Sequence, residues 1–259
     1  MNTFEFIDVS VNNHIATITI NRADKKNAFN NQTMEEFGAA IDAVNSNDDV
    51  RVVTIAAAGD IFCSGIDING SIDVTSAQTT PENIWKPIIL SISQAPKLYI
   101  AAVQGPAIGF GTAIMLACDM VIMSDKAFMQ LPFVNFGWVP DCGVNWELTR
   151  QLGVKRAIEF VTGAEKYSAE RCVEFGLANK AVAAEDFDST VAKLTQKLAA
   201  QAPLALKEAK RIIRLSQHIE LPESISLEAE TQQKLFQTAD AMEAMTAFMQ
   251  KRKPVFTGK

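Results

Sequence analysis

The sequence predicts an α/β fold in which strands and helices alternate, followed by a helical C-terminal region. In the front half, short β-branched or apolar runs alternate with amphipathic stretches. From residue 144 onward the apolar spacing is mostly helical, and no linker interrupts it. A chain of 259 residues, 48% of them hydrophobic, can bury a substantial core. We expect a core domain over residues 1–200 and a helical C-terminal region over residues 201–259.

In the front half, we expect strands over residues 15–20, 52–56, 98–103, 120–123 and 128–131. Parallel strands need crossover connections, so helices between these runs favour largely parallel pairing. One such helix has Asn30 or Asn31 as its cap. Its buried stripe consists of Met34, Phe37, Ile41 and Val44.

Four successive amphipathic helices are expected in the back half, over residues 183–200, 203–218, 222–237 and 240–251. The last of them carries an apolar stripe formed by Met242, Met245, Phe248 and Met249. Such a stripe is typical of a packing face, either on the chain's own core or on another subunit.

Composition excludes several function classes. The chain has 24 Lys+Arg against 30 Asp+Glu, and no long basic cluster, so we expect no nucleic-acid partner. Its four cysteines lack metal-like or disulfide-like spacing. The acidic N-terminus has no signal-peptide pattern, which favours the cytoplasm. The uncharged run 98–118 contains Gln104-Gly-Pro106, which indicates a strand, a turn and a buried helix rather than a membrane span.

Two glycine turns follow buried strands. Phe62-Cys-Ser-Gly65 comes after the strand at 52–56, and Gly109-Phe-Gly111 comes after the strand at 98–103. Turns of this kind leave backbone N–H groups unpaired. Taken singly, each turn fits an ordinary loop. Together they can aim one N–H apiece at a single oxygen, and each donor of such an oxyanion hole contributes roughly 3–4 kcal/mol.

These turns, taken with other motifs, resemble the crotonase superfamily of enoyl-CoA hydratases and isomerases. The motifs in order are Asn21-Arg22, Asn27-Ala28, Phe62-Cys-Ser-Gly65-Ile-Asp67-Ile, Gln104-Gly-Pro-Ala-Ile-Gly109-Phe-Gly, Cys118-Asp119, Pro132, Gly137, Pro140, Gly153 and Ser168-Ala-Glu170. The resemblance implies the crotonase (ClpP-like) fold, with stacked β-β-α units and a C-terminal trimerisation region. It also implies an acyl-CoA thioester substrate, no permanently bound cofactor besides the coenzyme A of that substrate, no metal, and a homotrimer or dimer of trimers.

The resemblance assigns roles to particular residues. Ile66 and Phe110 would supply the two oxyanion N–H groups. The positions that it places around CoA and substrate are Lys25, Lys26, Ala28, Ser64, Asp67, Ile68 and Gly109. The two lysines are equally typical of a solvated surface pair.

The chain also departs from the hydratase pattern. The two glutamates of typical hydratases are replaced by Ala113 and Phe133. Hydration needs groups that activate water and deliver a proton, so it cannot run on that pair. Asp141 stands where isomerases of the superfamily place one acid/base, in an apolar setting that would raise its pKa. The alternative role for Asp141 is a helix N-cap.

Three functions remain open on these residues. The first is a CoA-thioester isomerase that shifts a double bond or rearranges a ring epoxide, as in the enoyl-CoA isomerase and 1,2-epoxyphenylacetyl-CoA isomerase branch. The second is another crotonase reaction, such as hydration with non-standard carboxylates. The third is a non-catalytic acyl-CoA-binding protein.

The polar segment 70–80 and a helix over 81–94 are expected to shape the acyl pocket. Neither His14 nor His218 supports a Ser-His-Asp hydrolase.

Overall fold

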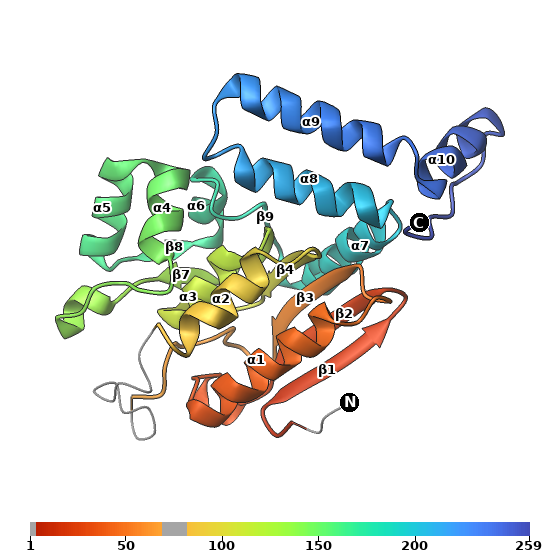
Figure 1. The fold of residues 1–259 in the computed structure, drawn as a ribbon. Helices are drawn as coiled ribbons and strands as arrows, with labels where there is room; N and C mark the ends of the chain where they lie inside the picture. The colour runs from red at the N-terminus through yellow and green to blue at the C-terminus, as the bar shows by residue number, and fades with distance from the viewer. Residues whose placement is uncertain (1–3, 69–81) are drawn as a thin grey trace.

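The computed structural model describes residues 4–68 and 82–259. Its centre is a six-stranded sheet in the order β1-β2-β3-β4-β6-β9 (Figure 1). The strands are β1 (Ile7–Asn12), β2 (Ile15–Ile20), β3 (Val52–Ala57), β4 (Leu98–Val103), β6 (Met120–Ser124) and β9 (Lys180–Val182). Only the β1–β2 pair in this sheet is antiparallel. The expected parallel pairing is therefore confirmed, and β4 is buried along its whole length, as a central parallel strand should be.

Helices cover the sheet on both faces. Side chains alternate along a strand, so Val53 packs with the residues of α1 (Asn31–Asn45), whereas its neighbour Val52 packs with those of α7 (Phe187–Ala199). Asn30 caps α1, because its side chain accepts the Thr33 N–H at 2.8 Å. The apolar stripe of α1 is buried as predicted.

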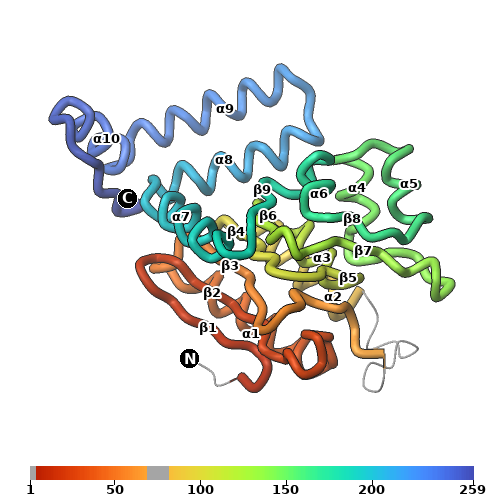
Figure 2. The backbone as a smooth tube through the Cα atoms, turned by 180° about the vertical axis from the view of Figure 1, so that it is seen from behind, coloured from red at the N-terminus to blue at the C-terminus, as the bar shows by residue number. Residues whose placement is uncertain are grey.

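A second, smaller sheet lies beside the first and carries the turns that matter for function (Figure 2). Its strands are β5 (Ala107–Ile108), β7 (Phe128–Gln130) and β8 (Lys166–Ser168), in the order β5-β7-β8. Around it stand five helices: α2 (Trp85–Ser93), α3 (Phe110–Ala117), α4 (Val144–Leu152), α5 (Val154–Gly163) and α6 (Ala169–Glu174). The uncharged run 98–118 is thus β4, a turn, β5 and α3. No helix among the described residues is long and apolar enough to cross a bilayer.

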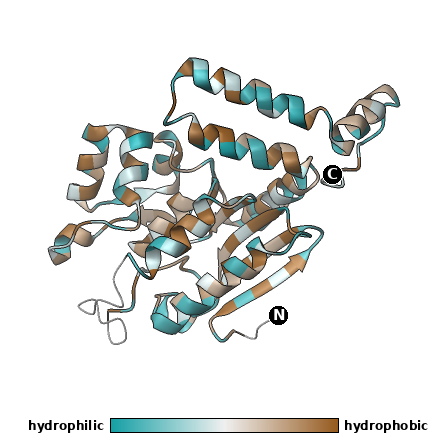
Figure 3. Cartoon of the chain, in the orientation of Figure 1, coloured by the Kyte–Doolittle hydropathy of each residue, from teal (hydrophilic) through white to brown (hydrophobic). Residues whose placement is uncertain are grey.

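Three helices complete the chain: α8 (Pro203–Leu215), α9 (Leu221–Leu235) and α10 (Ala239–Met249). Helix α8 rests on the body of the molecule, while α9 and α10 extend away from the sheet (Figures 1 and 2). The apolar stripe of α10 is exposed in this single chain, with Phe248 81% and Met249 72% exposed. Figure 3 shows that hydrophobic and hydrophilic residues are mixed along these three helices. The boundary between a core domain and a helical C-terminal region at residues 200 and 201 stays a prediction.

Several element bounds differ from expectation. Helix α7 begins at Phe187 rather than at Ala183, after a short 3₁₀ turn, Ala184–Asp186. The helix expected over 81–94 is α2, which starts only at Trp85. The segment 70–80 lies outside the described residues. The strands β8 and β9 were not predicted, because three residues are too few to show a period.

Candidate active site

The two glycine turns meet at the edge of the small sheet. The N–H of Cys63 donates to the Pro106 carbonyl at 3.1 Å, and the N–H of Ile108 donates to the Cys63 carbonyl at 2.8 Å. These bonds form a short parallel bridge between Cys63 and Ala107. Since each segment follows a parallel strand of the main sheet, both arrive at the same end of that sheet. The predicted convergence of the two turns is therefore what the structure shows.

Glycine is required at this junction for two reasons. A β-carbon on Gly111 would lie 2.5 Å from the Cys63 carbonyl oxygen, so a side chain there would force the turns apart. Gly65 has φ +101°, which L-residues adopt only with strain. A β-carbon on Gly65 would fall 3.7 Å from the backbone nitrogen of Phe110. The glycines thus bring the second turn within van der Waals distance of the first.

The backbone N–H groups of Ile66 and Phe110 are the two predicted oxyanion donors. Within the described chain, neither N–H has a hydrogen-bond acceptor. Phe110 is the first residue of α3, so its N–H also lies at the positive end of the helix dipole. Both residues line one cavity of about 470 Å³. The structure therefore places both candidate donors at the wall of the same pocket.

The walls of this cavity are predominantly aromatic and aliphatic. Five rings contribute to it: Trp85, Phe110, Phe133, Phe136 and Trp138. The rings of Phe136 and Trp138 stack at a centroid distance of 5.5 Å. Among the described lining residues, Asp141 is the only one with a charged side chain. An apolar pocket with a few convergent polar groups is the usual form of a small-molecule site.

Asp141 reaches this pocket from the end of β7. The N–H of Gly109 donates to the Gln130 carbonyl at 3.0 Å, which ties the oxyanion turn to that strand. A 3₁₀ turn, Phe133–Phe136, then leads to Asp141. Burial raises the pKa of the Asp141 carboxyl above its usual value, and a hydrogen bond from the Cys142 thiol opposes this rise. A carboxyl with a raised pKa is suited to proton transfer near neutral pH.

Asp141 does not cap a helix. Helix α4 begins three residues later, its N-cap residue is Gly143, and no side chain caps it. The contact of Asp141 with the start of α4 is made by its backbone carbonyl, which accepts the Val144 N–H at 3.1 Å. Cys142 and Gly143 both have positive φ, of 55° and 79°, and this double turn separates the carboxylate from the helix start. The side chain of Asp141 is therefore available to the cavity.

The two glutamate positions of the hydratase pattern hold Ala113 and Phe133, of which Phe133 lines this cavity and Ala113 does not. Ala113 is one turn beyond Phe110 on α3 and is 3% exposed. The ring of Phe133 lies 4.0 Å from where a β-carbon on Gly109 would be. Neither position carries a carboxyl group, and among the described residues that line this cavity Asp141 alone has one.

The residues expected around CoA form a second group beside the cavity. The N–H of Ser64 donates to the Lys26 carbonyl at 3.1 Å, and the N–H of Asp67 donates to the Phe29 carbonyl at 2.8 Å. These bonds hold the stretch of Lys25, Lys26 and Ala28 alongside the loop of Ser64 to Ile68. Both lysines are exposed. Of the expected binding residues, Ser64, Ile68 and Gly109 line the cavity itself.

The sequence indicated no individual role for Arg22 or Asn27. Arg22 pairs with Asp67 at 2.8 Å, so the Asp67 carboxylate helps to fix its own loop. Asn27 is fully buried and donates to the carbonyls of Ala58 and Ile61 at 2.8 and 2.7 Å. The motif Asn21-Arg22…Asn27-Ala28 pointed to these positions without showing what they do.

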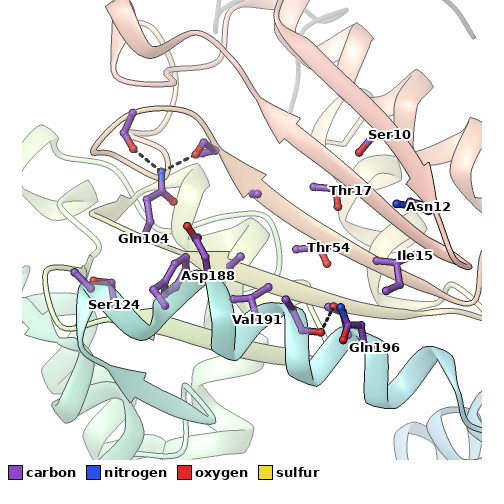
Figure 4. A pocket seen from close by; sticks show the side chains of 18 of the residues that line it. Ser10, Asn12, Ile15, Thr17, Thr54, Gln104, Ser124, Asp188, Val191 and Gln196 are labelled. Carbon is purple, nitrogen blue, oxygen red and sulfur yellow. Dashed lines mark hydrogen bonds between the residues drawn. The ribbon is translucent and has the colours of Figure 1, made fainter.

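A larger groove of about 960 Å³ lies elsewhere, between the sheet and α7 (Figure 4). Its floor consists mainly of neutral polar side chains such as Thr17, Thr54 and Ser124. Gln104 spans its edge, where its amide donates to the carbonyls of Ala57 and Gly59 at 2.9 and 3.0 Å. None of the predicted site residues lines this groove. Size alone therefore does not identify the active site.

Comparison with known proteins identifies the family of this chain. The family model described as enoyl-CoA hydratase/isomerase matches residues 10–259. The chain belongs to the enoyl-CoA hydratase/isomerase family. It is similar to the 1,2-epoxyphenylacetyl-CoA isomerase of Escherichia coli K12, with 32% identity over 98% of this chain and 99% of that protein. It is equally similar, at 32% identity over 99% and 100%, to a probable enoyl-CoA hydratase of Rhodobacter capsulatus.

The crotonase fold of this family is shown by solved structures. The enoyl-CoA hydratase of Bacillus anthracis matches with a TM-score of 0.93 at 27% identity, covering 98% of this chain and all of that one. The protein is therefore a crotonase-fold enzyme of the hydratase/isomerase family. Its relatives include proteins named for either reaction, so family membership alone does not choose between the two. No group of His, Cys, Asp and Glu side chains in the described part of the chain is arranged to hold a metal ion.

Proposed function

We propose that this family member is a CoA-thioester isomerase with Asp141 as its single acid/base. The observation that carries the proposal is the make-up of the 470 Å³ cavity, which combines two free N–H groups with one partly buried carboxyl. The reaction is either a double-bond shift or the rearrangement of a ring epoxide. Coenzyme A enters as part of the substrate, and no permanently bound cofactor is required.

The chemistry needs one proton-transfer group and one place for negative charge. The N–H groups of Ile66 and Phe110 hold the thioester oxygen as it becomes an enolate. Asp141 in its ionised form removes a proton from the acyl chain and returns it at another carbon. Asp141 returns as many protons as it removes. The double-bond shift therefore needs no second carboxyl group and consumes no water molecule. General acid–base catalysis of this kind contributes about 10²–10⁴-fold.

Hydration is the less favoured alternative because it makes a further demand. A water molecule must be positioned and activated in addition to the proton delivered to carbon. The hydratase positions for these tasks hold Ala113 and Phe133. The aromatic wall formed by Phe133, Phe136 and Trp138 also offers a bound water few hydrogen-bond partners. A pocket of this kind favours a reaction that excludes water.

The proposal extends to substrate contacts and assembly. Lys25 and Lys26 neutralise phosphates of CoA, and the loop of Asp67 and Ile68 flanks its adenine. The cytoplasm remains the expected compartment. The chain assembles as a homotrimer or dimer of trimers through its C-terminal helices, supported by the exposed apolar stripe of α10. Phe248→Glu should lower the mass measured by light scattering to that of a smaller species, and an unchanged mass would contradict this assignment.

The test of function combines a substrate panel with one isosteric variant. Wild-type protein and Asp141→Asn are assayed on 3-enoyl, 2-enoyl and epoxide thioesters, and CoA binding is measured by calorimetry. We expect isomerisation by the wild type only, with equal CoA affinity in both proteins. Full turnover by Asp141→Asn would exclude the acid/base assignment. Binding without turnover of any thioester by the wild type would favour a non-catalytic acyl-CoA-binding protein.

A further inference from the structure

A second cavity, of about 840 Å³, adjoins the first. Three segments contribute residues to both cavities. On α2, Trp85 lines the first and Ile89 the second, one turn further on. On α3, Phe110 lines the first and Ala113 the second. Residues one turn apart share a helix face, so the two cavities lie end to end along these helices.

The loop at Asp141 is the third segment whose neighbouring residues line the two cavities. Asp141 lines the first cavity, and its neighbour Cys142 lines the second. This loop therefore lies where the two cavities meet. From Ala113 to the end of α3 at Ala117, the second space extends about 6 Å along the helix axis. It is therefore deep enough for the far end of an acyl chain.

The floor and the wall of the second cavity differ in chemistry. The floor from α2 and α3 is mainly apolar and includes Ile89, Leu90 and Leu116, with Ser93 at the end of α2 as a polar exception. The wall is helix α8, which turns a cationic face toward the cavity: Lys207, Lys210, Arg211 and Arg214. Their spacing places all four on one side of the helix. In contrast, the apolar Ile213 of the same helix is 66% exposed.

Carboxylates compensate these cations only in part. Lys210 and Arg214 share the carboxylate of Asp119, at 2.7 and 3.0 Å. Arg211 pairs with Glu208 at 2.6 Å. Lys207 is exposed and makes no ion pair within the described part of the chain.

One carboxyl group, that of Glu147, lines the cavity itself. Burial raises the pKa of this carboxyl, which disfavours its charged form. The wall therefore keeps a surplus of positive charge above an apolar floor.

We propose that the second cavity receives the far end of the acyl group and that this end carries a carboxylate. The substrate is then a thioester whose acyl chain has an apolar middle and an anionic end near Lys207. An apolar floor suits the chain, and the surplus cation suits the terminal carboxylate. This inference rests on the proposed acyl-CoA site but not on isomerisation, because it concerns binding alone.

The test uses saturated thioesters, which bind without reacting. Calorimetry compares CoA thioesters of equal chain length that end in a methyl group or in a carboxylate. Lys207→Gln should weaken binding of the carboxylate-ended series about fivefold and leave the methyl-ended series unchanged. The matched control is Lys197→Gln, an exposed lysine on α7 away from the cavity. A Lys207→Gln variant that changes both series equally, or neither, would overturn the proposal.

Filling the cavity gives an independent measurement. Leu90→Trp should weaken binding of long thioesters of both series by at least tenfold while acetyl-CoA binds normally. Equal weakening of acetyl-CoA would show that the acyl chain does not take this path. Octanoate, added to protein loaded with acetyl-CoA, separates the two sources of a carboxylate. Octanoate binding that is lost in Lys207→Gln would make the cavity a separate fatty-acid site and overturn the acyl-end assignment.

The inference and the proposed function fail in different ways. If Asp141→Asn keeps full turnover, the acid/base assignment fails, but the preference for a carboxylate end remains measurable. If acetyl-CoA itself does not bind to the wild type, the acyl-CoA site fails and both proposals fall together.

Discussion

The N–H of Gly109 donates to the carbonyl of Gln130 at 3.0 Å. This bond joins the turn that presents one oxyanion donor to the strand from which the chain runs on to Asp141. Thr112 strengthens the joint, since its hydroxyl donates to the carbonyls of Ala107 and Gln130 at 2.9 and 3.2 Å. The two parts that the proposed function assigns to the oxyanion donors and to the acid/base are thus held by one small sheet. Catalytic groups supported in this way keep their relative geometry.

The contact between the two turns makes a stability prediction at Gly111. Gly111→Ala puts a β-carbon 2.5 Å from a backbone carbonyl oxygen that cannot move alone. We expect a loss of about 1–3 kcal/mol in the free energy of unfolding, and lower activity because the donors separate. Urea denaturation measures the change in the free energy of unfolding. The control is Gly163→Ala in α5, where the nearest atom is 3.7 Å away and the change should be neutral or stabilising. Equal stability of both variants would contradict the close approach.

A pH profile tests the environment of Asp141. The base form must be ionised, so kcat/KM should rise with pH through the pKa of Asp141. Burial raises that pKa, which places the acid limb above the usual aspartate value of about 3.9. Cys142→Ala removes a hydrogen bond that lowers the pKa, so the limb should move to higher pH. Cys142→Ser keeps a donor and should leave the limb near its wild-type position. A limb that stays fixed in both variants would exclude this contact.

The same pKa shift makes a prediction about folding. A carboxyl whose pKa is higher in the folded than in the unfolded state favours folding when it is protonated. That contribution is fully present below pH of about 3.9 and is lost as pH rises through the folded-state pKa. Asp141→Asn should therefore be more stable than the wild type at pH 7, with the difference vanishing toward pH 4. Asp60→Asn, at an exposed carboxyl outside the cavity, is the control for the substitution itself. A variant less stable at pH 7 would mean that Asp141 is a structural residue.

The buried ion cluster under α8 makes a separate prediction. The Asp119 carboxylate is 10% exposed and faces both Lys210 and Arg214. Asp119→Asn leaves these cations without their counter-charge and should cost about 3–5 kcal/mol. Glu174→Gln breaks the exposed pair with Arg171 and should cost less than about 1 kcal/mol. Thermal unfolding distinguishes them, and similar losses in both variants would show that the cluster is not effectively buried.

Much of the fold follows from periodicity. The strands β2, β3 and β4 and the stripe of α1 are long enough to show their periods, and the structure confirms them. Short elements are different. The strand β9, Lys180–Val182, pairs only because β6 already presents an edge, and no local signal marks it. The strands β2, β3 and β4 are thus predictable from the sequence, whereas the edge strand β1 was missed despite its six residues, and β9 depends on its contact with β6.

The site was predictable to the extent that its residues lie in turns with glycine. The turns of Gly65 and Gly109, and the isolated carboxyl of Asp141, stand out in the sequence. Trp85 and Phe136 do not, because an aromatic residue in a helix or a loop is most often a packing residue. The ion pair of Arg22 with Asp67 joins positions 45 residues apart, and no local pattern predicts such a contact.

The central claim is that Asp141 moves the proton. The most direct measurement is deuterium uptake from D₂O at the carbon next to the thioester of a 3-enoyl thioester, followed by NMR. Wild-type protein should exchange this position, and Asp141→Asn should exchange it at least 100-fold more slowly while binding the thioester with unchanged affinity. Exchange by Asp141→Asn at the wild-type rate would contradict the account.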